Sequence, residues 1–352
     1  MQENSKKELQ VSTQSAYTSR GVRSMKIALV KSNPLPYEHE SAVKQFARHG
    51  VFVVSISHEQ PEDVYIAWLK KERPDFAFCF FQKGEWDRFF SACKKTGTPL
   101  AGWLIRDPYE LDYTKRMVHH FDLAFSPDKN TAAVYRKLGH QHLFDLPHCL
   151  VPERYFPDKT SKQIYQSDLC ITGDADHKKA GYINYLHRQT DWTLRVVGRG
   201  WSNAIREFKP SPRLLAINYW VPPQIARLFY SNTKIVLTIP DELKASDNAT
   251  GFPAASPSPD FFAAAGCKAF QLVEKRKGIA GMFHSPKTIV QMNSKEECLA
   301  FAGHYLENEK ARVLMAEAAR NEIMRNHTIT HRISMIVSCL MEYTTAIHQE
   351  EI

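Results

Sequence analysis

The sequence lacks most of the features that mark membrane, secreted and disulfide-bonded proteins. No apolar run approaches the roughly 18 residues that a membrane-spanning helix needs. Residues 1–24 are polar and have no apolar core of a secretory signal, so we expect a disordered N-terminal extension there. The seven cysteines stand singly without a C-x-x-C pair, which favours reduced thiols in a cytoplasmic protein.

The histidines are not arranged to bind a metal ion, and the basic residues are not arranged to bind nucleic acid. His119-His120 and His140-x-His142 lack a matching set of partner residues, so the sequence predicts no metal site. The lysines and arginines form short groups without a long basic stripe that alternates with aromatic residues, which argues against nucleic acid as a partner. The formal net charge of +8 still suits anionic partners such as nucleotide sugars.

What is present is an alternation of short apolar strands and helical patterns. A chain of 352 residues with 43% apolar and 24% charged residues is typical of a globular protein with two domains. The alternation runs through two successive arrays, which predicts an α/β fold with two Rossmann-like domains, each a parallel sheet covered by helices. We expect an N-terminal domain at 25–152, a C-terminal domain at 153–328 and a final helix within 329–352.

The expected elements follow this alternation. The strands of the first array are Met25–Val30, Val51–Ile56, Asp75–Phe81, Pro99–Ile105 and Leu123–Phe125, and its helices are Ala42–His49, Asp63–Glu72, Trp86–Lys95 and Lys129–Leu138. The strands of the second are Asp168–Gly173, Leu194–Gly198, Lys234–Ile239, Ala269–Val273 and Thr288–Gln291, and its helices are Gly181–Arg188, Pro222–Tyr230, Phe261–Gly266, Lys295–Glu307, Glu309–Arg325 and Thr330–Ala346. Because ligands bind outside the carboxyl ends of such strands, we expect a deep cleft between the domains.

Phosphate-binding candidates follow the strand ends of the second array. Gly173 and Gly198-x-Gly200 let a backbone approach a phosphate closely, although each also suits a simple strand-ending turn. Lys178 is placed to neutralise phosphate charge, with a solvated surface lysine as the alternative. From Ser256 to Leu272, a loop of small residues and prolines leads into an Ala-rich helix. The free N–H groups at such a helix start attract anions, so this stretch predicts a pocket for a phosphorylated ligand.

Candidate acid–base residues lie in the first array. Asp107 and Glu110 follow an apolar strand, where a carboxylate can act as general base on an acceptor hydroxyl. Capping of the next helix by Asp107 is the alternative. His148, near the domain junction, is either an acid–base or phosphate contact or a loop histidine with a structural hydrogen bond.

The chain resembles the CgeB-like (spore maturation) family of GT-B glycosyltransferases from Met25 onward. The resemblance rests on six segments in this order: Trp103–Glu110, Leu146–His148, Asp168–Gly173, Gly198–Trp201, Pro253–Leu272 and His327–Arg332. It implies a nucleotide-sugar donor without a cofactor, and a last helix that crosses back to pack on the first domain. It also places Arg199, Ser258, Asp260 and Lys268 among the donor-binding positions.

Three positions depart from the pattern of that family. The pattern of the family that this chain resembles has an arginine at position 260, a glutamate at 263 and a glycine at 268. This chain has Asp260, Ala263 and Lys268 there. The family's glutamate looks like the acceptor of hydrogen bonds from the donor ribose, which alanine cannot replace. Asp260 reverses a charge expected to face phosphate, and Lys268 restores a positive charge.

The resemblance implies a glycosyltransferase that moves a sugar from a nucleotide-sugar donor to an unidentified acceptor, and it points to a spore or cell-surface layer as the location of that acceptor. The departures leave a second reading open, that of a catalytically silent GT-B scaffold or surface-assembly protein.

Overall fold

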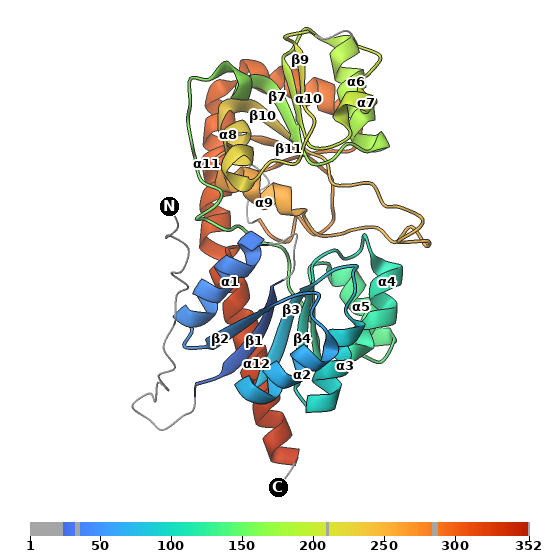
Figure 1. Cartoon of the computed structure of the whole chain (residues 1–352). Helices are drawn as coiled ribbons and strands as arrows, with labels where there is room; N and C mark the ends of the chain where they lie inside the picture. Colours follow the sequence, from blue (N-terminus) through green and yellow to red (C-terminus); the bar gives the residue numbers. More distant parts are fainter. Residues whose placement is uncertain (1–23, 32–35, 209–210, 284–287, 351–352) are drawn as a thin grey trace, which may run out of the picture.

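The structure is a computed structural model that describes residues 24–31, 36–208, 211–283 and 288–350. The predicted N-terminal extension, apart from Ser24, lies outside these residues. The described chain forms two lobes stacked one above the other (Figure 1). Among the described helices, none is both long enough and apolar enough to span a bilayer.

The first lobe is built on a six-stranded sheet in the order β2-β1-β3-β4-β5-β6. Its strands are β1 (Lys26–Lys31), β2 (Phe52–Ser57), β3 (Phe76–Phe81), β4 (Leu100–Leu104), β5 (Leu123–Ser126) and β6 (Leu143–Asp145). Its helices are α1 (Pro36–Arg48), α2 (Glu62–Glu72), α3 (Asp87–Thr96), α4 (Leu111–Met117) and α5 (Lys129–Lys137), with a 3-10 turn η1 (Val118–His120).

The second lobe repeats this architecture with the strand order β12-β11-β10-β7-β8-β9. Its strands are β7 (Ser167–Thr172), β8 (Leu194–Val197), β9 (Leu214–Ile217), β10 (Thr233–Thr238), β11 (Gln271–Glu274) and β12 (Val290–Met292). Its helices are α6 (His177–Gln189), α7 (Trp201–Ala204), α8 (Pro223–Asn232), α9 (Pro259–Gly266), α10 (Lys295–Glu307) and α11 (Glu309–Asn326), after a 3-10 turn η2 (Gln163–Tyr165). The pairing is parallel throughout both sheets, which confirms the predicted α/β fold.

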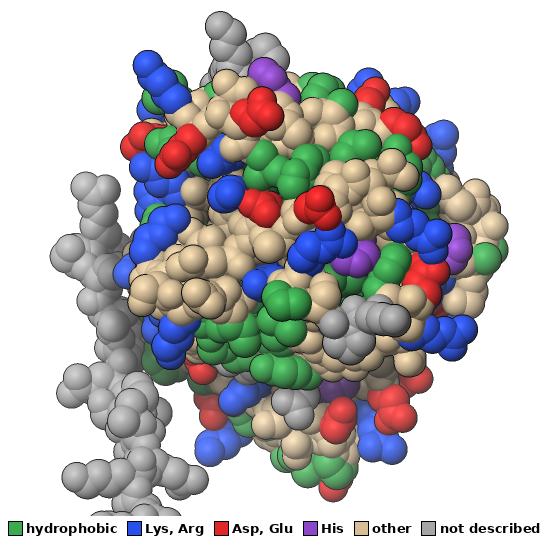
Figure 2. All heavy atoms as spheres, turned by 90° about the horizontal axis from the view of Figure 1, so that it is seen from above, with side chains coloured by type: hydrophobic (Ala, Val, Ile, Leu, Met, Phe, Trp, Pro, Cys, Tyr) green, Lys and Arg blue, Asp and Glu red, His purple; other side chains and the backbone are tan. Residues whose placement is uncertain are grey.

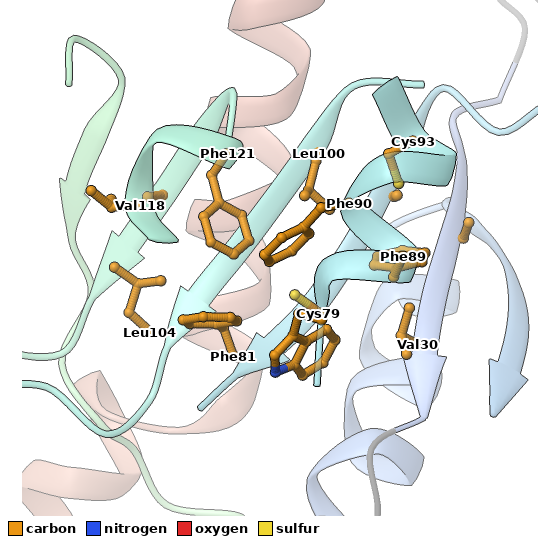
Figure 3. Close-up of a cluster of buried hydrophobic side chains, with 14 of the residues drawn as sticks. Val30, Cys79, Phe81, Phe89, Phe90, Cys93, Leu100, Leu104, Val118 and Phe121 are labelled. Carbon is orange, nitrogen blue, oxygen red and sulfur yellow. The ribbon is translucent and has the colours of Figure 1, made fainter. Parts of the chain in front are cut away.

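Both faces of the first sheet are buried, which explains why its strands read as unbroken apolar runs. On one face, Phe81 of β3 and Phe121 pack against Phe90 of α3 (Figure 3). On the other face, Ile27 and Leu29 pack in a cluster that includes residues of α1 and of α12 (Ile329–Glu350). The last helix therefore crosses back onto the first lobe, as the family resemblance implies (Figure 1).

The chain passes between the lobes at two places that lie side by side. Leu150 lies between β6 and β7, and it forms a parallel bridge with Thr328, which lies between α11 and α12. The amide of Leu150 donates to His327 O at 2.8 Å, and the amide of Ile329 donates to Leu150 O at 2.8 Å. The predicted boundary at 152 falls beside this crossing and stays a prediction.

The surface carries both signs of charge. Figure 2, seen from above, shows Lys and Arg side chains interspersed with Asp and Glu side chains over this face. The positive charge on this face is therefore divided among short groups.

Candidate functional site between the lobes

The carboxyl ends of the two sheets face each other, and one segment of the second lobe reaches across. Residues 239–258, here called the interlobe arm, connect β10 to α9 and run towards α4 of the first lobe (Figure 1). Asp112 N donates to Asp247 O at 3.0 Å, and Ala249 N donates to Asp112 Oδ2 at 2.7 Å. Asn248 Nδ2 donates to Pro108 O at 3.1 Å. The arm thus brings the strand ends of both lobes to one place.

Asp107 lies at the first-lobe side of this place and is only 4% exposed. Its two carboxylate oxygens accept hydrogen bonds from Ser126 Oγ at 2.9 Å and from Tyr135 Oη at 2.8 Å. Burial raises the pKa of Asp107 to about 7, because it disfavours the charged carboxylate more than these hydrogen bonds favour it. Its carboxyl can therefore exchange a proton near neutral pH, as a general base must. Asp107 does not cap the following helix, because the N-cap residue of α4 is Glu110.

His148 lines the same pocket as Asp107. Its ring stacks on Trp103 with the ring centres 6.4 Å apart, and Arg332 Nη2 donates to its carbonyl oxygen at 3.1 Å. Burial, followed by the charges of Arg106 and Arg332, lowers the pKa of His148 to about 3. The imidazole is therefore neutral at physiological pH and a weak base, and it can accept a hydrogen bond.

Glu110 stands at the edge of this arrangement rather than in the pocket. Its Oε2 accepts a hydrogen bond from Lys83 N at 2.6 Å, and its Oε1 lies 3.7 Å from Arg106 Nε. These contacts hold the loop after β3 and give Glu110 a supporting position. Among the predicted acid–base residues, the pocket thus brings together Asp107 and His148.

The glycines of the second lobe form close turns at the strand ends. A Cβ on Gly198 would lie 2.2 Å from Gly173 O, so only glycine permits the two loops to touch. Gly173 has φ +99° and Gly200 has φ +84°, in the left-handed region that favours glycine. Trp201 Nε1 donates to Gly173 O at 3.0 Å and fixes this turn.

Ser258 occupies the N-cap position of α9 and lines the interlobe pocket. It is 8% exposed, and its Oγ is buried without a hydrogen-bond partner among the described residues. Arg276 lines the same pocket: its Nη2 donates to Tyr109 Oη at 2.6 Å, and its Nη1 donates to Ser256 O. No carboxylate among the described residues pairs with Arg276. Sequence reasoning did not select Arg276, although it lies two residues after the end of β11, where the strand-end rule points.

Asp260 faces a network of charges at the strand ends. Its Oδ1 accepts a hydrogen bond from Tyr230 Oη at 3.0 Å, and burial, followed by the charge of Asp241, raises its pKa. Lys179 is 1% exposed and donates to Asp241 Oδ1 at 2.6 Å, with Asp176 Oδ2 at 3.1 Å. Asp241 Oδ2 in turn lies 3.5 Å from Arg106 Nη2 of the first lobe. The carboxylates of this network thus neutralise the positive charges of Lys179 and Arg106.

Three predicted donor-binding cations lie away from the pocket and are paired. Lys178 Nζ is 2.8 Å from Glu274 Oε2, and Arg199 Nη2 is 2.6 Å from Asp174 Oδ2. Lys268 lies at the opposite end of α9 from Ser258, and its Nζ is 3.3 Å from Glu317 Oε1. The charge of Lys268 therefore does not replace a cation at the phosphate-facing helix start.

The structure also accounts for Ala263 and for the backbone conformation of Lys268, the two departures other than Asp260. Ala263 is buried in an apolar cluster with Tyr230 and Val236, so the pocket gains no hydrogen-bond acceptor there. Lys268 has φ +57°, a left-handed conformation for which glycine is the least strained residue. This requirement explains the glycine that the family pattern has at position 268.

The expected deep cleft is closed in this conformation. The pocket lined by Asp107, His148, Ser258 and Arg276 has a volume of about 20 Å³, about enough for one water molecule. A larger open cavity of about 920 Å³ lies at the opposite, amino ends of β7, β8 and β10, lined by Lys159, Arg195 and Lys234 among others. No group of three His, Cys, Asp or Glu side chains within the described ranges is arranged to hold a metal ion.

Comparisons with known proteins agree with this architecture. Residues 181–338 match a family model described as glycosyl transferase-like. The spore protein CgeB of Bacillus subtilis (strain 168) is 25% identical over 262 residues, which are 72% of this chain and 80% of CgeB.

Solved structures with the same arrangement include glycosyltransferases. The structure of Anabaena HepE in complex with UDP-glucose has a TM-score of 0.66 at 11% identity and covers 90% of this chain and 100% of its own. The lipopolysaccharide outer core galactosyltransferase WaaB has a TM-score of 0.59 at 16% identity, with 91% and 100% covered. These likenesses show the GT-B fold. The resemblance of this chain to the CgeB-like family of GT-B glycosyltransferases is therefore confirmed, in sequence and in fold.

Proposed function

We propose that this chain is a glycosyltransferase that uses a nucleotide-sugar donor at the interlobe pocket. The observation that carries the proposal is the buried, unpartnered Oγ of Ser258 at the start of α9, in a pocket that Arg276 also lines. A hydroxyl, a guanidinium and a helix N-terminus together suit the diphosphate of such a donor. HepE, which shares the fold, has been solved with UDP-glucose, and this makes a uridine nucleotide the first donor to test.

The reaction proceeds as a displacement at the anomeric carbon. The oxygen of an acceptor hydroxyl forms a bond to that carbon while the bond to the diphosphate oxygen breaks, and the nucleoside diphosphate leaves with the bonding electrons. Asp107, with a pKa of about 7, takes the hydroxyl proton, because His148, with a pKa of about 3, is too weak a base for this role. Arg276 and the start of α9 stabilise the negative charge that develops on the leaving group.

This mechanism requires that the lobes move apart before the donor binds. A cavity of about 20 Å³ cannot admit a nucleotide, so the described conformation corresponds to a closed state. Closure over bound substrate would exclude water from the reacting groups. We propose an acceptor in a spore or cell-surface layer, since CgeB is a spore protein.

The second candidate is a GT-B scaffold without catalysis, for instance in surface assembly. The observation that favours it is the self-neutralised network of Lys179, Asp241 and Asp260 near the strand ends. Carboxylates at these positions oppose a diphosphate, and Ala263 supplies no acceptor for a ribose hydroxyl. In this reading the closed lobes are the working state.

Calorimetry and thermal-shift measurements with UDP and UDP-sugars separate the two candidates. A ligand that binds the folded state raises its melting temperature. We expect wild type to bind, and Ser258→Ala and Arg276→Gln to bind at least about tenfold more weakly, because each loses a contact to the diphosphate. Lys178→Gln is the matched control, since Lys178 pairs with Glu274 outside the pocket. If no nucleotide or nucleotide sugar stabilises wild type, the scaffold candidate stands.

A further inference from the structure

Asp128 of the first lobe makes a buried connection to the second lobe. It is the N-cap residue of α5 and is 1% exposed. Its Oδ1 accepts hydrogen bonds from the amides of Asn130 at 3.0 Å and Thr131 at 3.4 Å. Its Oδ2 accepts two more from the interlobe arm, from Ala255 N at 2.6 Å and Ser256 N at 2.9 Å. One carboxylate therefore satisfies two amides of its own helix and two of the other lobe.

The two ion pairs between the lobes that flank the arm are more exposed. In the pair of Lys83 with Asp247, the lysine side chain is 57% exposed. In the pair of Arg106 with Asp241, the side chains are 41% and 44% exposed. Exposed ion pairs contribute little because water and salt screen them, whereas a buried hydrogen bond to a charged group contributes more. Of these three links between the lobes, the contact of Asp128 is therefore the one that solvent weakens least.

The two amides that Asp128 holds belong to a dipeptide beside the start of α9. Ser256 is two residues from Ser258, and its carbonyl accepts a hydrogen bond from Arg276. The carbonyl of Ala255 accepts from Gly278 N at 2.8 Å. The dipeptide is therefore fixed by the first lobe through its amides and by the second lobe through its carbonyls.

Asp128 also touches the neighbours of Asp107. Its amide donates to Ser126 Oγ at 3.2 Å, and the same hydroxyl donates to Asp107 Oδ2 at 2.9 Å. A short chain of hydrogen bonds therefore runs from Asp107 through Ser126 and Asp128 to the arm. Each of these links is buried within the described structure.

We propose that Asp128 is a positioning residue that holds the start of α9 and Arg276 of the second lobe in register with Asp107 of the first lobe. It does so by anchoring the amides of Ala255 and Ser256 when the lobes are closed. The direct effect of this contact is to keep the two lobes closed. Its effect on nucleotide affinity rests additionally on the proposed function.

The geometry specifies what a substitution does. Asparagine at position 128 keeps one oxygen for the cap of α5, but its amide nitrogen cannot accept from Ala255 and Ser256. In Asp128→Asn we expect the amides of Ala255 and Ser256 to exchange hydrogen at least about tenfold faster than in wild type. We also expect a larger radius of gyration by small-angle scattering and weaker binding of UDP. Asp112→Asn is the matched control, because its side chain is 29% exposed and accepts one amide of the same arm.

A second variant separates the arm from the helix cap. Ala255→Pro removes one of the two donors and leaves the cap of α5 intact, so it should also speed the exchange at Ser256. If folded Asp128→Asn exchanges at both amides, and folded Ala255→Pro at the amide of Ser256, no faster than Asp112→Asn does, the proposal is wrong. In wild type the two amides should exchange well below the rate of a free amide, and exchange at the free rate there would equally overturn the proposal. If wild type exchanges as expected but binds no UDP, the proposed function fails and the positioning role stands.

Discussion

Asp107 shows how burial turns an ordinary carboxyl into a group that titrates near neutrality. The sequence places it after an apolar strand, and Pro108 follows it directly. The structure adds the cause of its raised pKa: burial away from solvent outweighs the opposing hydrogen bonds from Ser126 and Tyr135. These partners come from β5 and α5, so no local pattern around Asp107 could identify them.

The titration of Asp107 should appear in the pH dependence of stability. Folding raises its pKa from 3.8 to about 7, so its stabilising contribution is complete below about pH 4 and is lost as the pH rises through 7. We predict that, from pH 4 to 8, the unfolding free energy of wild type falls by up to about 4 kcal/mol relative to that of Asp107→Asn. Urea unfolding of both proteins across this range measures the difference. Parallel pH profiles would mean that Asp107 titrates with an ordinary pKa.

The departures at 260, 263 and 268 show which residue-level inferences the sequence supports. It identifies all three positions as unusual, because the resemblance supplies a pattern to compare. It cannot show that Lys268 points towards Glu317, or that Asp260 lies in a network with Lys179 and Asp241, since these contacts depend on the packing of distant helices and strands.

At the scale of elements, the turns that end β7 and β8 carry the strictest requirement. They touch through Gly173 and Gly198, with no room for a side chain at position 198. The sequence pattern of a glycine after each strand indicates the turns individually. It does not indicate that position 198 requires glycine because the carbonyl of Gly173 occupies the space of a side chain there.

We predict that Gly198→Ala lowers the free energy of unfolding by about 3 kcal/mol, because the new Cβ meets the carbonyl of Gly173 and the backbone has φ +146°. The control is Gly97→Ala, at a position with φ +67° and no atom within 4 Å. That change should lower the free energy by only about 1 kcal/mol. Chemical unfolding of both variants measures the two values, and equal losses would show that the contact of the two turns is unimportant.

The strands and helices with strong periodicity could be predicted, but four short strands and α-helices were missed. β6, β9, α4 and α7 have between three and seven residues, and none shows a clear period. β9 is an edge strand with one buried residue, Leu214, so its sequence lacks the apolar run of the inner strands. Such elements are defined by pairing with a neighbour rather than by their own residues.

At the scale of the molecule, the last helix makes the first lobe depend on the end of the chain. α12 contributes buried isoleucines to the same cluster as β1 and α1. We predict that Ile333→Ala, at a position with 0% exposure, lowers the free energy of unfolding by about 3 kcal/mol. Met335→Ala, at a position with 45% exposure on the same helix, should change it by less than about 0.5 kcal/mol. Similar losses in the two variants, measured by urea unfolding, would contradict the packing of α12.

The paired crossings at Leu150 and Thr328 have a mechanical consequence. Two connections that lay far apart would restrict the lobes to rotation about the line that joins them. Two that are bonded to each other act as one hinge, about which one lobe can rotate as a rigid body in more than one direction. Groups beside this hinge, such as His148, then move least during the rotation, while the tip of the interlobe arm moves farthest.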